Sequence, residues 1–287
     1  MFPEKIRHKI EVGKADQIKE FRPVGGGCIS ETGVLIFSSG ESAFVKTRSS
    51  SQPSDMLPKE AHGLQALRES GALRIPQVYQ IDEDFLLMEY IAPGHQKADF
   101  FSRLGRGLAR MHKKTSPTFG FHQDNYCGAI PQKNRPPMKD WSEFYFHNRL
   151  LFQLNLLEKK GYVLDGLPAK ISALGKKLPG LLKGSEEPPS LLHGDLWGGN
   201  YLVDENGDPA LMDPAVYYGH REAELGMTLL FGGFTQDFYQ SYEAAYPLAP
   251  GWQKRMGLYK LYHLMNHCNL FGTSYLGQCH DVLDEYV

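Results

Sequence analysis

The spacing of hydrophobic and polar positions divides the chain into an N-terminal part that favours strands and a longer part that favours helices. Short β-rich runs stand at 34–37, 43–47, 77–81 and 85–90, with turn-forming residues between the members of each pair. Helical spacing within this part is clearest at 59–70, which ends at Gly71. Residues 1–90 therefore predict a mostly antiparallel sheet that carries one helix.

From residue 91 onward the spacing is mainly helical. Helices are expected at 100–112, 140–160, 164–182 and from 221 to the end, with a break around 246–251. Two short apolar runs at 201–203 and 210–212, flanked by turns, predict a hairpin inserted among these helices. The pattern predicts an α+β fold with two lobes, 1–90 and 91–287, and ligands often bind between lobes.

Composition limits the classes of function. The 287 residues carry a formal net charge of −2, which argues against broad attraction to nucleic acid or to an anionic membrane. No run of about eighteen apolar residues is present, and the first residues, MFPEKIRHKIEVGK, lack the apolar core of a signal peptide. Four cysteines form no CxxC pair, so neither a disulfide scaffold nor a zinc site is expected. We expect a cytoplasmic protein with no nucleic-acid or membrane partner.

The strongest chemical signal lies in LLHGDLWGGN at 191–200 and in LMDP shortly after it. An apolar run leads into a loop that holds Asp195 and Asn200, and the predicted hairpin then ends on Asp213. Kinase chemistry uses one carboxylate at the attacking hydroxyl, and an amide oxygen with a second carboxylate to hold Mg²⁺ on the phosphates. Single Asp and Asn residues are common in loops, but the whole constellation favours phosphoryl transfer.

A glycine-rich segment, VGGGCISETG at 24–33, precedes this site in the sequence. Its glycines Gly25, Gly26 and Gly27 could bring backbone N–H groups close to phosphate, although the segment matches neither GxGxxG nor GxxxxGK[ST] and alone is more typical of a turn. Lys46 follows in a predicted strand and could reach the α and β phosphates, with Glu60 as its ion-pair partner. The alternatives are an edge-strand lysine and an exposed helix carboxylate.

The order of these motifs, GGGCIS…FVK…KEAHGL…MEYI…HGDLWGGN…MDPAVYYGHREAELGM, resembles the fructosamine-3-kinase (ketosamine-3-kinase) family. These enzymes are protein-kinase-like phosphotransferases related to aminoglycoside and choline kinases. The resemblance covers nearly the whole chain, and HGDLWGGN and DPAVYYGHREAE are its specific motifs. It implies a protein-kinase-like fold and phosphorylation of the sugar O3 of a ketosamine, as a small molecule or on a glycated protein lysine. ATP and Mg²⁺ are the implied cofactors, and the unstable product then releases the amine.

The resemblance also implies roles for individual residues. Asp195 is the implied catalytic base, and Asn200 and Asp213 are the implied Mg²⁺ ligands. Lys46 is the implied phosphate-binding lysine, with Glu60 as its partner. The implied adenine-binding hinge is the backbone of Glu89, Tyr90 and Ile91. HGD stands where protein kinases have HRD, DPA stands where they have DFG, and no activation segment with an APE end is evident. These differences favour a metabolite over a protein-kinase substrate.

Substrate contacts are less closely defined by the sequence. Trp197, inside the catalytic loop, could stack on a sugar or on the aliphatic part of an amine, or could pack in the core beneath the loop. The candidates His220, Arg221, Glu222 and Glu224 follow the metal-binding segment at the start of a predicted helix. Acidic residues there can simply complement a helix N-terminus, whereas the resemblance suggests that the stretch borders the ketosamine pocket. We expect one of the four to touch substrate.

Cys28 is a candidate for redox regulation. It stands among the glycines of the phosphate-loop candidate, where exposure and N–H dipoles could lower the pKa of its thiol, although a small buried thiol is the more usual role. The resemblance implies that some members form a disulfide between two such loops in a dimer. The other cysteines, at 127, 268 and 279, are expected to be ordinary packing residues, and the chain is expected to be a monomer or a homodimer.

Two other functions stay open. The first is a kinase of another small hydroxyl compound, of the aminoglycoside or choline type, against which DPAVYYGHREAE argues. The second is an ATP-binding pseudokinase without turnover, although every residue type that phosphoryl transfer needs is present. The sequence does not distinguish fructosamines from ribulosamines or erythrulosamines as substrates.

Overall fold

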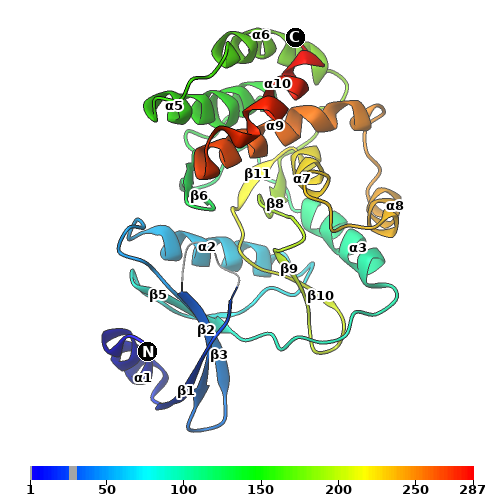
Figure 1. The fold of residues 1–287 in the computed structure, drawn as a ribbon. Coiled ribbons are helices and arrows are strands. Elements are labelled where there is room, and N and C mark those ends of the chain that lie inside the picture. Colours follow the sequence, from blue (N-terminus) through cyan, green and yellow to red (C-terminus); the bar gives the residue numbers. More distant parts are fainter. Residues whose placement is uncertain (1, 26–30) are drawn as a thin grey trace.

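The computed structural model describes residues 2–25 and 31–287, with a five-stranded antiparallel sheet at one end and most of the helices at the other (Figure 1). The strand order is β1-β2-β3-β5-β4. The strands are β1 (Ile18–Pro23), β2 (Glu31–Phe37), β3 (Ser42–Thr47), β4 (Val78–Ile81) and β5 (Phe85–Glu89). The predicted hairpin 34–37/43–47 corresponds to β2 and β3, and the predicted strands at 77–81 and 85–90 correspond to β4 and β5.

Two helices flank this sheet, α1 (Glu4–Lys14) and α2 (Met56–Glu69). Side chains of a strand alternate between its faces, so β3 and β5 each contribute to two hydrophobic clusters. Ala43, Val45, Phe85 and Leu87 pack with Ile6 and Ile10 of α1, whereas Leu86 and Met88 pack with Leu57, Ala61 and Leu64 of α2. The sequence analysis predicted only α2. Helix α1 was missed because it buries two apolar positions within a mostly charged segment.

The predicted helices of the second part are present, with their ends adjusted. They are α3 (Phe100–His112), α4 (Trp141–Tyr145), a π-helical turn (Phe146–Leu151), α5 (Phe152–Lys159), α6 (Leu167–Leu181), α7 (Arg221–Thr228), α8 (Gln236–Ala245), α9 (Trp252–Phe271), a 3-10 turn (Thr273–Tyr275) and α10 (Leu276–Asp284). Helix α9 packs against α7, α5 and α10 in the large hydrophobic core, which extends to α2. Among the helices of the described residues, none has the length and apolarity that a lipid bilayer requires.

Three pairs of short strands lie within this second part. They are β6 (Asn125–Cys127) with β7 (Ile130–Gln132), β8 (Ser190–Leu192) with β11 (Tyr217–Gly219), and β9 (Tyr201–Val203) with β10 (Pro209–Leu211). Only β9–β10 was predicted, because strands of three residues are too short to show a two-residue period. The fold is the predicted α+β class.

Candidate active site

Two loops meet where the short strand pairs end. The first, residues 193–200, runs from β8 to β9, and the second, residues 212–216, runs from β10 to β11. They are tied together by backbone hydrogen bonds from Met212 N to Asn200 O (3.0 Å) and from Ala215 N to His193 O (2.8 Å). The two loops therefore form one unit, and Asp195, Asn200 and Asp213 are carried on it.

A buried carboxylate anchors the first loop from behind. Glu224 of α7 accepts hydrogen bonds from the backbone N–H groups of His193 (2.5 Å) and Gly194 (3.0 Å). Gly194 has φ +85°, and a Cβ atom at this position would lie 2.0 Å from the Ala215 carbonyl oxygen. Only glycine combines this conformation with so close an approach, which explains the HGD triplet in place of HRD. The backbone before Asp195 is thus fixed by contacts on both sides.

Asp195 and Asn200 are in direct contact. Asn200 Nδ2 donates to the Asp195 carbonyl oxygen at 2.7 Å and approaches Asp195 Oδ2 at 3.4 Å. Burial, followed by the nearby negative charges of Asp213 and Glu224, raises the pKa of Asp195 to about 7. A carboxyl group that titrates near neutral pH in a cleft is suited to accepting a proton during a reaction.

Lys46 connects the sheet to the second loop. Its ammonium group lies 2.7 Å from Glu60 Oε1 on α2 and 2.5 Å from Asp213 Oδ1. Although burial opposes it, the charges of Asp213 and Glu60 keep the pKa of Lys46 above its usual value, so the lysine stays cationic. Burial raises the pKa of Glu60, against the attraction of Lys46. The pairing that was hypothesised for Lys46 and Glu60 is therefore present.

Asn200 and Asp213 supply the donor set that Mg²⁺ prefers, a side-chain amide oxygen and a carboxylate. Asn200 uses its Nδ2 for the contacts with Asp195, so its amide oxygen is oriented away from them. Asp213 has φ +57°, a conformation uncommon for residues other than glycine, and such backbone outliers concentrate at functional sites. The residues present therefore fit a magnesium ion. Asp213 already pairs with one cation, the ammonium group of Lys46.

These groups face a cleft of about 720 Å³ between the sheet and the loops. Part of the cleft wall is apolar and is formed by Val24, Phe44, Met88, Ile91, Leu202 and Met212. The predicted hinge residues Glu89, Tyr90 and Ile91 also line it. The Glu89 carboxylate accepts hydrogen bonds from Arg74 Nη2 (2.8 Å) and Gln77 N (3.1 Å), so its side chain is used to fix the end of β5. An apolar slot beside a fixed backbone segment suits a planar base.

Of the glycine-rich segment, Gly25 lies at the cleft wall. Gly26, Gly27 and Cys28 lie outside the described residues, so their assigned roles stay predictions.

Trp197 stands in the cleft. Its side chain is 40% exposed and lines the same cavity as Asp195 and Asp213, so the core-packing alternative does not apply. A Cβ atom on Gly199 would lie 2.4 Å from the indole ring, so glycine at 199 makes room for Trp197. The indole also meets Phe231 edge to face, with ring centroids 6.4 Å apart. The aromatic surface beside Asp195 is therefore held in position.

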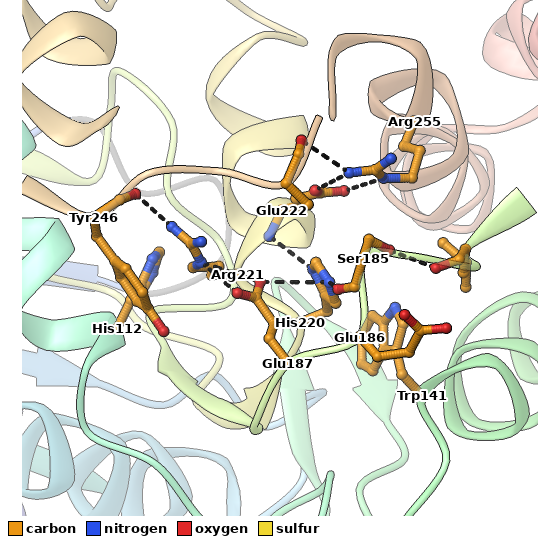
Figure 2. A network of polar contacts seen from close by, with 12 residues as sticks. His112, Trp141, Ser185, Glu186, Glu187, His220, Arg221, Glu222, Tyr246 and Arg255 are labelled. Atoms are coloured by element: carbon orange, nitrogen blue, oxygen red, sulfur yellow. Dashed lines mark hydrogen bonds and ion pairs between the residues drawn. The ribbon is translucent and has the colours of Figure 1, made fainter. Parts of the chain in front are cut away.

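The four other substrate candidates are buried, and Figure 2 shows three of them, His220, Arg221 and Glu222, beside internal partners. His220 Nε2 contacts the Ser185 carbonyl oxygen at 2.6 Å, and Arg221 pairs with Glu187. Glu222 pairs with Arg255 at 2.5 Å, and Glu224 anchors the catalytic loop. Within the described part of the chain, the cleft wall includes none of these four candidates. Burial and internal partners occupy all four, so the structure gives no support to the expectation that one of them touches substrate.

Cys127, which was expected to be an ordinary packing residue, lies beside the proposed catalytic residue. It ends β6, and its sulfur lies close to the Asp195 carboxylate and to a ring nitrogen of His263 on α9. The sequence offers no signal for this proximity, because the three residues come from distant parts of the chain and meet only in the folded structure.

Comparisons with known proteins agree on one family. A sequence model of the fructosamine kinase family matches residues 1–287. The chain is 41% identical over 282 residues to protein-ribulosamine 3-kinase, chloroplastic, of Oryza sativa subsp. japonica, covering 96% of this chain and 81% of the relative. It is 34% identical over 304 residues to ketosamine-3-kinase of Mus musculus, covering 96% and 97%.

The solved structures show the same relationship. A crystal structure from Thermobifida fusca, assigned as a fructosamine-3-kinase, superimposes with a TM-score of 0.89 at 30% identity and covers 98% of both chains. A choline kinase from Streptococcus pneumoniae superimposes with a TM-score of 0.68 at 14% identity, covering 99% of this chain and 98% of that chain. At that identity the second likeness concerns the fold alone, which is kinase-like.

Proposed function

The chain belongs to the fructosamine kinase family, and we propose that it transfers the γ-phosphoryl group of ATP to the sugar O3 hydroxyl of ketosamines. The observation that carries this proposal is the meeting of two sets of groups in one cleft. Lys46, Glu60 and Asp213 form a chain of ion pairs at the phosphate side, and Asp195 lies beside Asn200 on the same pair of loops. This arrangement suits a positioned phosphate next to a proton acceptor.

On the phosphate side, the ammonium group of Lys46 binds the α and β phosphates and stays paired with Glu60. Asn200 and Asp213 are the residues that would hold Mg²⁺, which supplies charge neutralisation to the phosphate oxygens when it is bound. Before nucleotide binds, the Lys46–Asp213 pair at 2.5 Å balances the charge of the Asp213 carboxylate. Binding of Mg·ATP would separate this pair, because each partner then acquires an opposite charge from the nucleotide complex.

On the substrate side, Asp195 is the catalytic base. The O3 oxygen attacks the γ-phosphorus, the bond from that phosphorus to the ADP oxygen breaks, and the O3 proton passes to Asp195. Trp197 would cover the sugar or the alkyl chain of the amine. From Trp197 the aromatic surface continues through Phe231 and His267 to Phe271, with neighbouring ring centroids 6.4, 4.7 and 5.5 Å apart. This row suits the aliphatic part of a glycated lysine.

Two alternatives have weaker support. The aminoglycoside and choline kinases share the fold at 14 to 15% identity, whereas the ribulosamine and ketosamine kinases are 34 to 41% identical. A pseudokinase is opposed by the presence of Lys46, Glu60, Asp195, Asn200 and Asp213 together in one cleft. A cytoplasmic location stays a prediction, since the rice relative is named as chloroplastic. Redox control through Cys28 and a monomeric or homodimeric state also stay predictions.

The test is ADP release in the presence of Mg·ATP with ribulosyl-lysine, fructosyl-lysine or an aminoglycoside as acceptor. The proposal predicts turnover with a ketosamine and none with the aminoglycoside. Turnover with the aminoglycoside alone would overturn the substrate class and keep the kinase chemistry. ATP binding without transfer to any acceptor would favour the pseudokinase.

A further inference from the structure

Three side chains with metal-binding atoms meet at the proposed catalytic carboxylate, which is one of them. They are Cys127 at the end of β6, Asp195 in the first loop and His263 on α9. One ligand atom of each (a thiol sulfur, a carboxylate oxygen and an imidazole nitrogen) lies within 4.8 Å of the other two. Cys127 is 2% exposed and His263 is 4% exposed, so the cluster is an interior one and differs from the acidic clusters common on protein surfaces.

A second observation concerns His263 itself. Its buried Nδ1 atom has no hydrogen-bond partner among the described residues, and orphaned buried polar atoms are rare in proteins. Burial, together with the neighbouring His267 and Arg149, lowers the pKa of His263 to about 3, so the ring is neutral at physiological pH. A neutral imidazole is the form that binds metal ions. His263 therefore brings to the cluster a neutral ring, one buried nitrogen of which has no partner among the described residues.

We propose that Cys127, Asp195 and His263 form a binding site for a borderline-soft divalent cation of the zinc class. Thiolate, imidazole and carboxylate are the ligands of Zn²⁺ sites, and three protein ligands leave a fourth tetrahedral position for water or substrate. Ligand bonds of roughly 2.0–2.3 Å require ligand atoms about 3.3–3.8 Å apart, so the side chains close in by about 1 Å. On binding, the Cys127 thiol releases its proton to solvent and the sulfur bonds to the metal.

The cluster is chemically distinct from the proposed magnesium site. Asn200 and Asp213 offer only oxygen atoms, which suit Mg²⁺, whereas sulfur and nitrogen in the cluster select against it. Asn266 Nδ2 approaches Cys127 Sγ at 3.5 Å, and such outer hydrogen bonds orient a metal-bound sulfur. Because Asp195 belongs to the cluster, an ion bound there withdraws the catalytic base from the substrate. This inhibition rests on the proposed function, whereas binding of the ion does not.

The proposal departs from the expectation, drawn from the sequence, that no zinc site exists. That expectation did not consider that His263 and His267 are four residues apart, a spacing that can place two histidines on one helix face. The structure uses only His263 in the cluster, because His267 Nδ1 bonds the His263 carbonyl oxygen at 2.8 Å and its ring packs against Phe231 and Phe271.

Binding is tested with Co²⁺ as a spectroscopic substitute for Zn²⁺, in a Cys28→Ser background that removes the thiol predicted to be redox-active. We expect a thiolate-to-cobalt charge-transfer band that Zn²⁺ abolishes. The band should be lost in Cys127→Ser and retained in Cys268→Ser, a buried cysteine away from the cleft. His263→Gln should weaken Zn²⁺ binding at least about tenfold. A band that persists in Cys127→Ser, or equal Zn²⁺ affinity in all variants, would overturn the proposal. Should Cys127→Ser fail to fold, Cys127→Ala and His263→Gln provide the same test.

Inhibition is tested separately, with Mg²⁺ in excess and each variant compared with its own rate without zinc. We expect Zn²⁺ inhibition that is relieved by ketosamine and unaffected by ATP, with the half-inhibitory concentration at least about tenfold higher in His263→Gln. Inhibition that a further increase in Mg²⁺ relieves, and that ketosamine does not, would assign zinc to Asn200 and Asp213. That result would contradict the inhibitory role of the cluster. A protein that shows the cobalt band yet phosphorylates no ketosamine would refute the proposed function and keep the metal site.

Discussion

In the nucleotide-free protein, Asp195 should lower the free energy of unfolding as the pH rises. Replacing Asp195 with asparagine should remove this contribution to the pH dependence of stability. The folded structure raises the pKa of Asp195 from 3.8 to about 7, first through burial and then through the charges of Asp213 and Glu224. The folded state therefore binds the proton more tightly than the unfolded chain does. The stability that this proton contributes is complete below the unfolded pKa and is lost as the pH rises through about 7.

The size of the effect follows from the two pKa values. One pH unit between them corresponds to about 1.36 kcal/mol, so from about pH 5 to about pH 8 the wild type loses about 2.7 kcal/mol through this group. Asp195→Asn has a similar shape and no titration. Its advantage over the wild type should therefore be about 2.7 kcal/mol larger at about pH 8 than at about pH 5. The same pair of proteins is compared at the two pH values. The free energy of any hydrogen bond that the amide changes is therefore present at both and largely cancels.

The assay is urea unfolding of both proteins at the two pH values, without nucleotide and with a chelator present. Asp237→Asn is a suitable control, because that carboxylate lies in the first turn of α8, away from the cleft. A stability difference between Asp195→Asn and the wild type that is the same at both pH values would contradict the raised pKa of Asp195 in the folded state. A larger advantage of Asp195→Asn at the lower pH would mean that folding lowers this pKa.

Further predictions follow from the same contacts. Trp197→Ala should raise KM for ketosamine about tenfold or more and leave KM for ATP unchanged, because the indole faces the acceptor side; steady-state kinetics with both substrates decides this. Lys46→Met should lower stability by about 3 kcal/mol in urea unfolding and weaken ATP binding in calorimetry, because two carboxylates lose their partner. Arg255→Met should lower stability by about 3 kcal/mol with both KM values unchanged, because Glu222 is left buried and unpaired. Arg103→Met, which breaks an exposed pair, should lower stability much less. The rate at low substrate should rise about tenfold per pH unit below about 7, as the proposed base ionises, and a flat pH–rate profile would contradict this.

The sequence predicted those parts of the fold whose pattern is local. Helix α3 was predicted with its observed ends, and the β2–β3 hairpin was found from its turn residues. Helix α1 and the strands β1, β6, β7, β8 and β11 were missed, because each is stabilised by distant packing or is too short to show a period. The π-helical turn at 146–151 interrupts a helix that was predicted as one piece.

The same contrast holds within the site. Asp195, Asn200 and Asp213 stand in two short segments of recognisable order, so their proximity could be predicted. The stretch beginning at His220 has an equally distinctive sequence, yet its charged groups have internal partners. Arg221 pairs with Glu187 and Glu222 pairs with Arg255, as Figure 2 shows, and Glu224 binds the backbone of the catalytic loop. A motif indicates that residues matter and leaves open whether they contact a ligand or support those that do.

The most direct test of the proposed function is to identify the product of a single turnover. Wild-type protein and Asp195→Asn would be mixed with ATP, Mg²⁺ and ribulosyl-lysine, and the phosphorylated carbon located by phosphorus–proton NMR, with ATP binding measured in parallel. The proposal predicts a phosphate on O3 with the wild type, and unchanged ATP binding with a rate lower by at least about a hundredfold in the variant. Phosphate on another hydroxyl, or an undiminished rate in Asp195→Asn, would contradict it.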